Sequence, residues 1–114
     1  MAGAERDTRG DLLRGTLEML ILQTLTHGPM HGYGIAQHLG RVSREVLAIE
    51  EGSLYPALQR LLVKGLVSAE WRKTPNNQRA RYYTLTRAGR SHLGVQSEEF
   101  ERFIGAVRRV MVEA

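Results

Sequence analysis

The chain contains no cysteine among its 114 residues. Disulfide bonds and thiolate metal sites are therefore excluded, and the absence is typical of proteins from a reducing compartment such as the cytoplasm. Long apolar runs are also missing, because the longest one near the start covers only residues 19–22, far too few to cross a bilayer. The polar residues 1–11 lack the apolar segment of a signal peptide. We therefore expect a cytoplasmic protein with no membrane partner.

Acidic residues are absent from a long stretch in the second half of the chain. Residues 71–97 include six Arg or Lys residues and no Asp or Glu, whereas the net charge of the whole chain is only +4. Such a local excess of positive charge favours an anionic partner. Because the charge lies on a short polar segment and not on an amphipathic helix, nucleic acid is favoured over a membrane surface.

The segment from Gly52 to Gly65 predicts a helix with two chemically different faces. Ser53 is the expected N-cap, Pro56 falls in the expected first turn, and Gly65 ends the helix. At about 100° per residue the leucines share one face and polar side chains share the opposite one. Such polar groups can contact phosphates and base edges in a DNA major groove. The outward set is Tyr55, Pro56, Gln59 and Arg60.

A basic hairpin is predicted directly after this helix. Strand-like patterns over residues 66–71 and 80–86 flank a polar loop. Adjacent strand residues point to opposite faces, so we expect Tyr83 in the core, Tyr82 at the surface and Trp71 packed on the strands. A polar-faced helix followed by a basic hairpin is the arrangement of a winged helix-turn-helix, in which the hairpin is the wing. The wing residues expected to contact DNA are Arg72, Lys73, Asn77, Arg79 and Arg81.

Two further helices are predicted before the recognition helix. Residues 12–26 predict a first helix, capped by Asp11, whose apolar side chains lie on more than one side, which indicates burial on more than one side. Residues 31–39 predict a shorter second helix. Gly32 and Gly34 are poor helix formers, so their presence indicates that the backbone there lies close to another part of the molecule. Residues 42–50 are expected to connect the second and third helices, with a short strand at 47–49.

The last helix is predicted to run from a cap at Thr86 to about residue 112. Its apolar residues Leu93, Phe100 and Val107 recur every seven positions, which is heptad-like spacing. Such a stripe has to be buried, and we expect a second copy of the chain to cover it together with part of the first helix. The alternative is packing against the chain's own first helix. The expected dimer residues are Leu17, Leu20, Leu93, Phe100, Phe103, Ile104, Val107 and Met111.

The predicted fold is mostly α-helical with a small β-hairpin. A polar tail over residues 1–11 precedes a winged helix-turn-helix DNA-binding domain over 12–86, and a C-terminal dimerisation helix covers 87–114. His27 and His31 are four residues apart, but the intervening Gly28-Pro29 breaks any helix that would align them. We therefore expect no metal and no other cofactor, and no group of side chains supports an enzyme.

Two adjacent acids, Glu50 and Glu51, precede the predicted recognition helix. Negative side chains at a helix N-terminus interact favourably with the helix dipole. They would repel phosphates, so they are expected either to pair with a nearby arginine or to accept a hydrogen bond from a cytosine amino group. The sequence leaves these alternatives open.

Four motifs occur in order along residues 14–90. They are Arg-Gly-Thr-Leu-Glu-Met-Leu-Ile-Leu at 14–22, His-Gly-Tyr-Gly-Ile at 31–35, Glu-Gly-Ser-Leu-Tyr-Pro-Ala-Leu at 51–58 and Tyr-Tyr-Thr-Leu-Thr-Arg-Ala-Gly-Arg at 82–90. Together they resemble the PadR family of bacterial transcriptional regulators. The single helix after the wing is similar to the smaller PadR subgroup, and the runs before Tyr55 and around Asn77 look like the acidobacterial type.

This resemblance implies a homodimeric winged-helix repressor that binds an operator near a promoter. It implies that Ser53, Tyr55 and Gln59 belong to the recognition helix, over residues 53–64. It also implies that His31 and Tyr33 lie near the phosphate backbone, at the start of the second helix.

We therefore expect a sequence-specific regulator that binds double-stranded operator DNA as a homodimer and responds to a ligand. A small apolar effector bound between the first and last helices would change the spacing of the two recognition helices. The main rival hypothesis is a winged-helix module that binds protein, with the basic wing facing an acidic partner. The salt dependence and sequence preference of DNA binding discriminate between the two.

Overall fold

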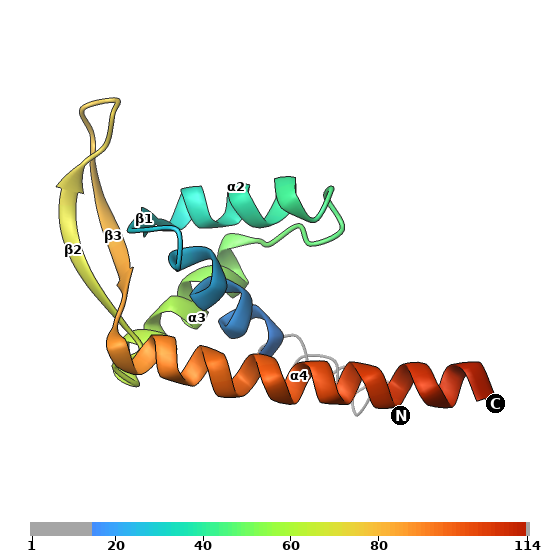
Figure 1. Cartoon of the computed structure of the whole chain (residues 1–114). Coiled ribbons are helices and arrows are strands. Elements are labelled where there is room, and N and C mark those ends of the chain that lie inside the picture. Colours follow the sequence, from blue (N-terminus) through green and yellow to red (C-terminus); the bar gives the residue numbers. More distant parts are fainter. Residues whose placement is uncertain (1–14, 114) are drawn as a thin grey trace.

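The computed structural model describes residues 15–113 as a group of helices beside a small sheet (Figure 1). The three strands are antiparallel in the order β1-β3-β2, which confirms the mostly helical winged fold. The expected cap Asp11, the start of the first helix and Ala114 lie outside the described residues. Residues 15–25 are helical, and they are followed by β1 (Met30–His31), α2 (Gly32–Val42), α3 (Glu51–Val63), β2 (Val67–Lys73), β3 (Arg79–Leu85) and α4 (Arg87–Glu113).

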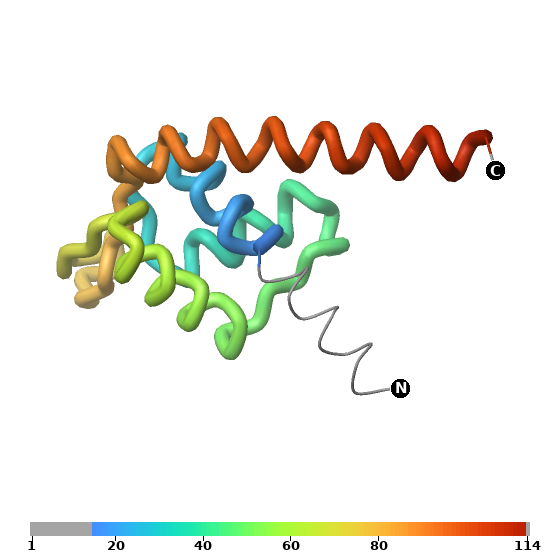
Figure 2. The backbone as a smooth tube through the Cα atoms, turned by 90° about the horizontal axis from the view of Figure 1, so that it is seen from below, coloured from blue at the N-terminus to red at the C-terminus, as the bar shows by residue number. Residues whose placement is uncertain are grey.

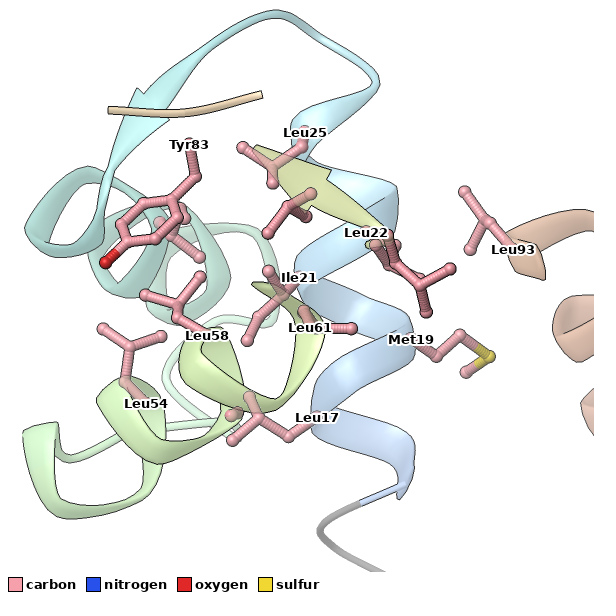
Figure 3. Packing of buried hydrophobic residues seen from close by; sticks show 14 of the residues in the cluster. Leu17, Met19, Ile21, Leu22, Leu25, Leu54, Leu58, Leu61, Tyr83 and Leu93 are labelled. Carbon is pink, nitrogen blue, oxygen red and sulfur yellow. The ribbon is translucent and has the colours of Figure 1, made fainter. Parts of the chain in front are cut away.

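A buried apolar cluster surrounds the helix 15–25 (Figure 3). Ile21 lies toward the leucines of α3, whereas Met19 and Leu22 lie toward Leu93 of α4. The expected burial of the first helix on more than one side is thus confirmed for these residues, and the chain's own elements cover both sides. Tyr83 of β3 is also in the core, as predicted. Each fully buried leucine or isoleucine contributes about 1.5–3 kcal/mol, so this cluster fixes how the helices are placed.

α3 begins earlier than the sequence predicts. Its N-cap is Glu50, whose carbonyl accepts hydrogen bonds from the N–H groups of Ser53 and Leu54. The prediction of Ser53 as N-cap is therefore wrong, and Pro56 lies in the second turn and not in the first. Pro56 cannot donate a helical hydrogen bond, so the carbonyl of Gly52 lacks its usual partner within the helix.

The end of α3 follows the sequence prediction. Gly65 has a φ of 73°, in the left-handed region that glycine adopts without strain. Its N–H donates to the carbonyl of Leu62 at 3.0 Å, and the N–H of Leu66 donates to the carbonyl of Leu61 at 2.9 Å. This is a Schellman ending. Leu61 and Leu66 are both buried, so the turn is also held by apolar packing.

The region around α2 differs from the prediction in two places. Met30 and His31 form a short strand that pairs with Tyr83 and Tyr82, and α2 runs on from Gly32 to Val42. The strand expected at 47–49 is wrong, because these residues belong to an irregular connection without a strand partner. Its start is tight: Arg44 and Glu45 have φ values of 54° and 66°.

The first turns of α4 are joined closely to the end of α3. Thr86 caps α4 as predicted, because its hydroxyl accepts from the N–H of Gly89 at 3.0 Å. The same hydroxyl donates to the carbonyl of Gly65 at 2.8 Å. A side chain at Gly89 would place its Cβ 2.0 Å from the carbonyl oxygen of Leu66, so only glycine allows this approach.

The remainder of α4 extends far beyond the packed elements (Figure 2). The molecule is accordingly elongated, with a longest dimension of 55 Å. Across residues 15–113, every helix is too short or too polar to serve as a membrane span.

Gly89→Ala and Gly94→Ala should have opposite effects on stability. The Gly89 change forces α4 away from the Leu66 carbonyl, and overpacking of this kind costs about 1–3 kcal/mol or more. Gly94 lies exposed on the same helix with nothing near its Cβ position, so alanine there should stabilise the helix by about 0.5–1 kcal/mol. Urea unfolding of both variants checks this, and equal effects would contradict the close approach at Gly89.

Candidate nucleic-acid interface

The leucine face of α3 sets which of its side chains point outward. Leu54, Leu58 and Leu61 are completely or almost completely buried. The opposite face is therefore presented to solvent, where Ser53, Pro56 and Gln59 are all exposed. The outward position expected for Pro56 and Gln59 agrees with the structure, and Ser53 lies on the same exposed face. The side chain of Gln59 makes no hydrogen bond within residues 15–113, so its amide is available to a ligand.

One flank of α3 rests on the start of α2 through Tyr55. A Cβ added at Gly32 would lie 2.8 Å from the Tyr55 ring and from its hydroxyl oxygen. The close approach that the sequence indicated at Gly32 is therefore confirmed, and its partner is Tyr55. Burial, with smaller contributions from Glu51 and Tyr83, raises the pKa of Tyr55. Tyr55 is still partly exposed, so it braces the helix and keeps an edge at the surface.

The other flank of α3 is held by an ion-pair cluster with the helix 15–25. Arg60 Nε donates to Glu18 Oε2 at 2.6 Å, and Lys64 Nζ donates to Glu18 Oε1 at 3.0 Å. Glu18 is only 8% exposed. The guanidinium of Arg60, expected to face DNA, is thus turned toward Glu18 because the buried carboxylate needs a charged partner.

The electrostatics of Glu18 follow from this geometry. Burial alone would raise the pKa of its carboxyl group. Hydrogen bonds from Arg60 and Lys64, together with the attraction of their charges, outweigh burial and hold the pKa of Glu18 below its ordinary value. Glu18 is therefore ionised at neutral pH.

The register of the wing separates its cations by face. In the hairpin, Lys73 is paired with Arg79 across the two strands, and Trp71 is paired with Arg81. Because side chains alternate along a strand, all four lie on the face that carries Tyr83. Tyr83 belongs to the core, so this inner face of the hairpin continues from the core outward. Lys73, Arg79 and Arg81 are exposed there, and within residues 15–113 none of the three pairs with an acid.

Arg72 lies on the opposite, outer face of the hairpin. Its Nε donates to Glu70 Oε1 at 2.6 Å, so its charge is partly neutralised by its own strand. It also lies 5.4 Å from the centre of the Tyr82 ring. Among the predicted wing cations, Arg72 therefore differs from the three on the inner face.

Trp71 is more exposed than the sequence indicated. The residue is 60% exposed, and the guanidinium of Arg79 lies 5.3 Å from its ring centre. Trp71 therefore packs on the strands, as predicted, but its partner there is Arg79 on the neighbouring strand and not a core side chain. This contact gives Arg79 a defined position at the surface.

A groove of about 470 Å³ separates the start of α2 from the tip of the wing. His31 and Tyr33, predicted to lie near phosphate, line one wall. His31 Nδ1 accepts from the N–H of Gly34 at 3.0 Å, which caps α2 and requires the ring proton on Nε2. Across the groove are Thr74, Pro75, Asn76, Gln78, Arg79 and Ala80.

The tip of the wing has the geometry of a tight turn. Asn77 has a φ of 64°, a left-handed conformation that asparagine tolerates better than most residues. Its N–H donates to the carbonyl of Thr74 at 2.9 Å. Asn77 is exposed, so it remains available for contact with a ligand.

Neither adjacent acid at the start of α3 pairs with a base in the part of the chain that the structure describes. Glu51 lies in the first turn, where its charge suits the helix dipole. Residues 15–113 contain no cluster of three His, Asp or Glu side chains that could hold a metal ion. The rings of His27 and His38 lie near each other, with their centres 5.5 Å apart.

The sequence model of the transcriptional regulator PadR-like family matches residues 21–95. The chain belongs to this family. A transcriptional regulator from Clostridium thermocellum is 27% identical and has a TM-score of 0.79, and the match covers 87% of this chain and 96% of that one. A PadR family transcriptional regulator from Eggerthella lenta is 26% identical, with a TM-score of 0.74 and 97% of both chains covered. An uncharacterized protein X from Lysinibacillus sphaericus is 28% identical over 92 residues, which are 81% of this chain and 84% of that protein.

Membership of the PadR-like family makes this protein a DNA-binding transcriptional regulator and not an enzyme. The exposed outer face of α3 and the cationic inner face of the wing are the surfaces of this regulator that suit such a role. Its sequence did not reveal the part played by Glu18, because the carboxylate lies within an apolar helix. The polar Gln37, which accompanies Tyr33 at the groove, was also missed.

The predicted dimer residues of this PadR-like regulator fall into three groups that differ in burial. Leu17 and Leu93 are buried within the chain's own core, so the packing that the sequence left as an alternative accounts for them. Leu20 and Phe100 are half-buried against the same core, and Ile104 is partly exposed. Phe103, Val107 and Met111 are exposed on α4.

Glu18→Gln should lower stability in a pH-dependent way. The folded pKa of Glu18 is lowered, so its contribution is fully present above the ordinary carboxyl range and is lost as the pH falls through the lowered folded value. The variant should lose about 1–2 kcal/mol near neutral pH. Urea unfolding at several pH values should show this loss shrinking in acid, and a loss that is independent of pH would contradict the ion pairs. Glu98→Gln, an exposed site on α4, provides the control.

Proposed function

We propose that this PadR-like regulator binds a specific operator as a homodimer and acts as a ligand-responsive repressor in the cytoplasm. The observation that carries the proposal is the sorting of wing charges. Lys73, Arg79 and Arg81, the cations without an acidic partner, share the face of the hairpin that continues from the core. Arg72, which has an acidic partner, lies on the other face.

In the proposed complex, α3 enters the major groove and the wing contacts the phosphate backbone. The exposed amide of Gln59 suits an adenine edge, to which it can donate and accept together. The hydroxyl of Ser53 and the exposed edge of Tyr55 lie on the same helix, close to its N-terminus. His31 and Tyr33 contact a phosphate from the α2 side of the wing groove.

A second copy of the chain covers the distal part of α4 in this proposal. Phe103, Val107 and Met111 lie about one helical turn apart and are 55%, 40% and 74% exposed. A stripe of large apolar side chains on a helix that extends past its own domain needs a partner of matching pattern. An identical helix supplies that pattern, as expected for a symmetric dimer.

In this proposal, an apolar effector binds between the helix 15–25 and α4. A groove of about 300 Å³ there is lined by Met19, Phe100 and Phe103, with Thr16, Gln96 and Glu99 at its polar parts. Because Phe103 also belongs to the proposed dimer stripe, a ligand in this groove would alter the dimer geometry. The spacing of the two α3 helices, and so the affinity for an operator with fixed half-site spacing, would change with it.

Gln59→Ala and Arg79→Ala should separate specificity from general affinity. An operator is first selected from a pool of random duplexes. Gln59→Ala should weaken operator binding by about 1–3 kcal/mol with little effect on random duplex. Arg79→Ala should weaken both and reduce the salt slope by about one ion. If the selection finds no preferred sequence, the regulator proposal fails and a protein-binding winged helix becomes the better account.

Phe103→Asp with Val107→Asp should convert the dimer into monomers. Two carboxylates in the apolar stripe would have to be buried without partners, which dimer contacts cannot offset. Val112→Asp is the matched control, because Val112 is 84% exposed and lies on another side of α4. Sedimentation equilibrium measures the result. A double variant that sediments as the same dimer as the wild type would show that α4 is not the main interface.

A further inference from the structure

Glu18 binds two cations near the C-terminus of α3: Arg60 in its last turn and Lys64 directly after it. Arg60 and Lys64 are one helical turn apart, and each of them binds a different oxygen of the same carboxylate, at 2.6 Å and 3.0 Å. A carboxylate that accepts both partners in this way fixes the direction of both side chains. Glu18 itself is held in place because the helix 15–25 is buried on more than one side.

Arg60 and Lys64 lie close to the outward face of α3. Arg60 follows Gln59 directly, at about 100° around the helix, and it lies one turn beyond Pro56. Both neighbours are exposed on the outward face. The side chains of Arg60 and Lys64 remain 31% and 52% exposed, so neither cation is sealed inside the protein. Without Glu18, both side chains could turn toward a phosphate that lies beside α3.

The cations of the wing differ from Arg60 and Lys64 in whether they have an acidic partner. Lys73, Arg79 and Arg81 have no acidic partner among residues 15–113, whereas the two cations at the C-terminal end of α3, Arg60 and Lys64, share one. Phosphate contacts add affinity for every DNA sequence equally. A recognition helix whose cations are held away from phosphate therefore contributes mainly through its polar outward groups, which can distinguish base pairs.

We propose that Glu18 is a positioning residue that withholds Arg60 and Lys64 from DNA phosphates and thereby limits the affinity of the regulator for non-operator DNA. The inference rests on the proposed DNA-binding role of α3. It assigns the general affinity to the wing and the discrimination to the outward face of α3. Glu18 never touches DNA and acts only through the two cations that it binds.

The test measures binding to a random-sequence duplex over a range of salt concentrations, by fluorescence anisotropy with the full chain. Glu18→Gln keeps the shape of the side chain but removes its charge, so it should release both cations. Binding to the random duplex should tighten by about tenfold, and the salt slope should steepen by about one to two ions. The ratio of operator affinity to random affinity should fall.

Matched variants test whether Glu18 acts by holding Arg60 and Lys64 away from phosphate. They separate this effect from the loss of one negative charge and from the loss of structure. Glu98→Gln removes one negative charge at an exposed site on α4 and should leave the salt slope almost unchanged. The triple variant Glu18→Gln, Arg60→Gln, Lys64→Gln should return the random-duplex affinity and slope to wild-type values, because the released cations are gone. Lys64→Gln alone, at a half-exposed position, should leave the slope as it is in the wild type.

Three outcomes would overturn the proposal. In the first, Glu18→Gln has the same slope as Glu98→Gln. In the second, the triple variant keeps the steeper slope, so the effect does not pass through Arg60 and Lys64. In the third, Lys64→Gln alone lowers the slope, so Lys64 already contacts phosphate. The random-duplex measurements need no operator, so they test Glu18 even if the wild-type protein shows no sequence preference and the proposed function fails.

Discussion

The burial of the leucine face of α3 is the constraint on which the candidate interface depends. Leu54, Leu58 and Leu61 are buried in the apolar cluster that contains the helix 15–25, and this packing fixes the rotation of α3 about its own axis. A helix set in this way can present only one face to solvent. The two flanks then acquire their roles from their neighbours, with Tyr55 against Gly32 on one side and the cations against Glu18 on the other. The exposed amide of Gln59 is a consequence of this packing.

Strand register has the same organising effect on the wing. A shift of one residue between β2 and β3 would move the basic side chains to the other face of the hairpin. Tyr83 prevents this, because its ring is buried at the base of the hairpin and its pairing with Ala69 sets the alternation beyond it. The position of a core tyrosine thus determines where the charges at the surface lie.

Much of the fold could be predicted from local patterns. The leucine face of α3, the glycine stop at Gly65, the cap at Thr86 and the inward position of Tyr83 follow from rules that involve only neighbouring residues. The predicted N-cap Ser53 is wrong because the helix already begins at Glu51, where the acidic side chain suits the helix dipole. Boundaries of this kind depend on tertiary contacts that propensity does not describe.

The candidate site was harder to predict where it depends on distant residues. Glu18 and Arg60 are 42 positions apart, and helical periodicity identifies the face of a residue but not the element opposite it. The heptad spacing that includes Leu93 is limited in the same way. It predicts that the side chain is buried but not which helix buries it. Trp71 was placed on the correct strand, but its exposure depends on how far the hairpin extends beyond the core.

The joint between Gly89 and Leu66 has a mechanical consequence for the long helix that begins there. Thr86 and Gly89 attach α4 at one end to the residues that terminate α3, whereas its other end has no support from the described chain. α4 is also held farther along by Leu93 and Phe100, which pack on the core, so only the part beyond Phe100 is a free arm. The residues 101–113 span about 20 Å, so a rotation of roughly 5° at Phe100 moves the far end by roughly 1.7 Å. Conversely, a force applied to the far end acts on the core through Phe100 and on the end of α3 through Gly89.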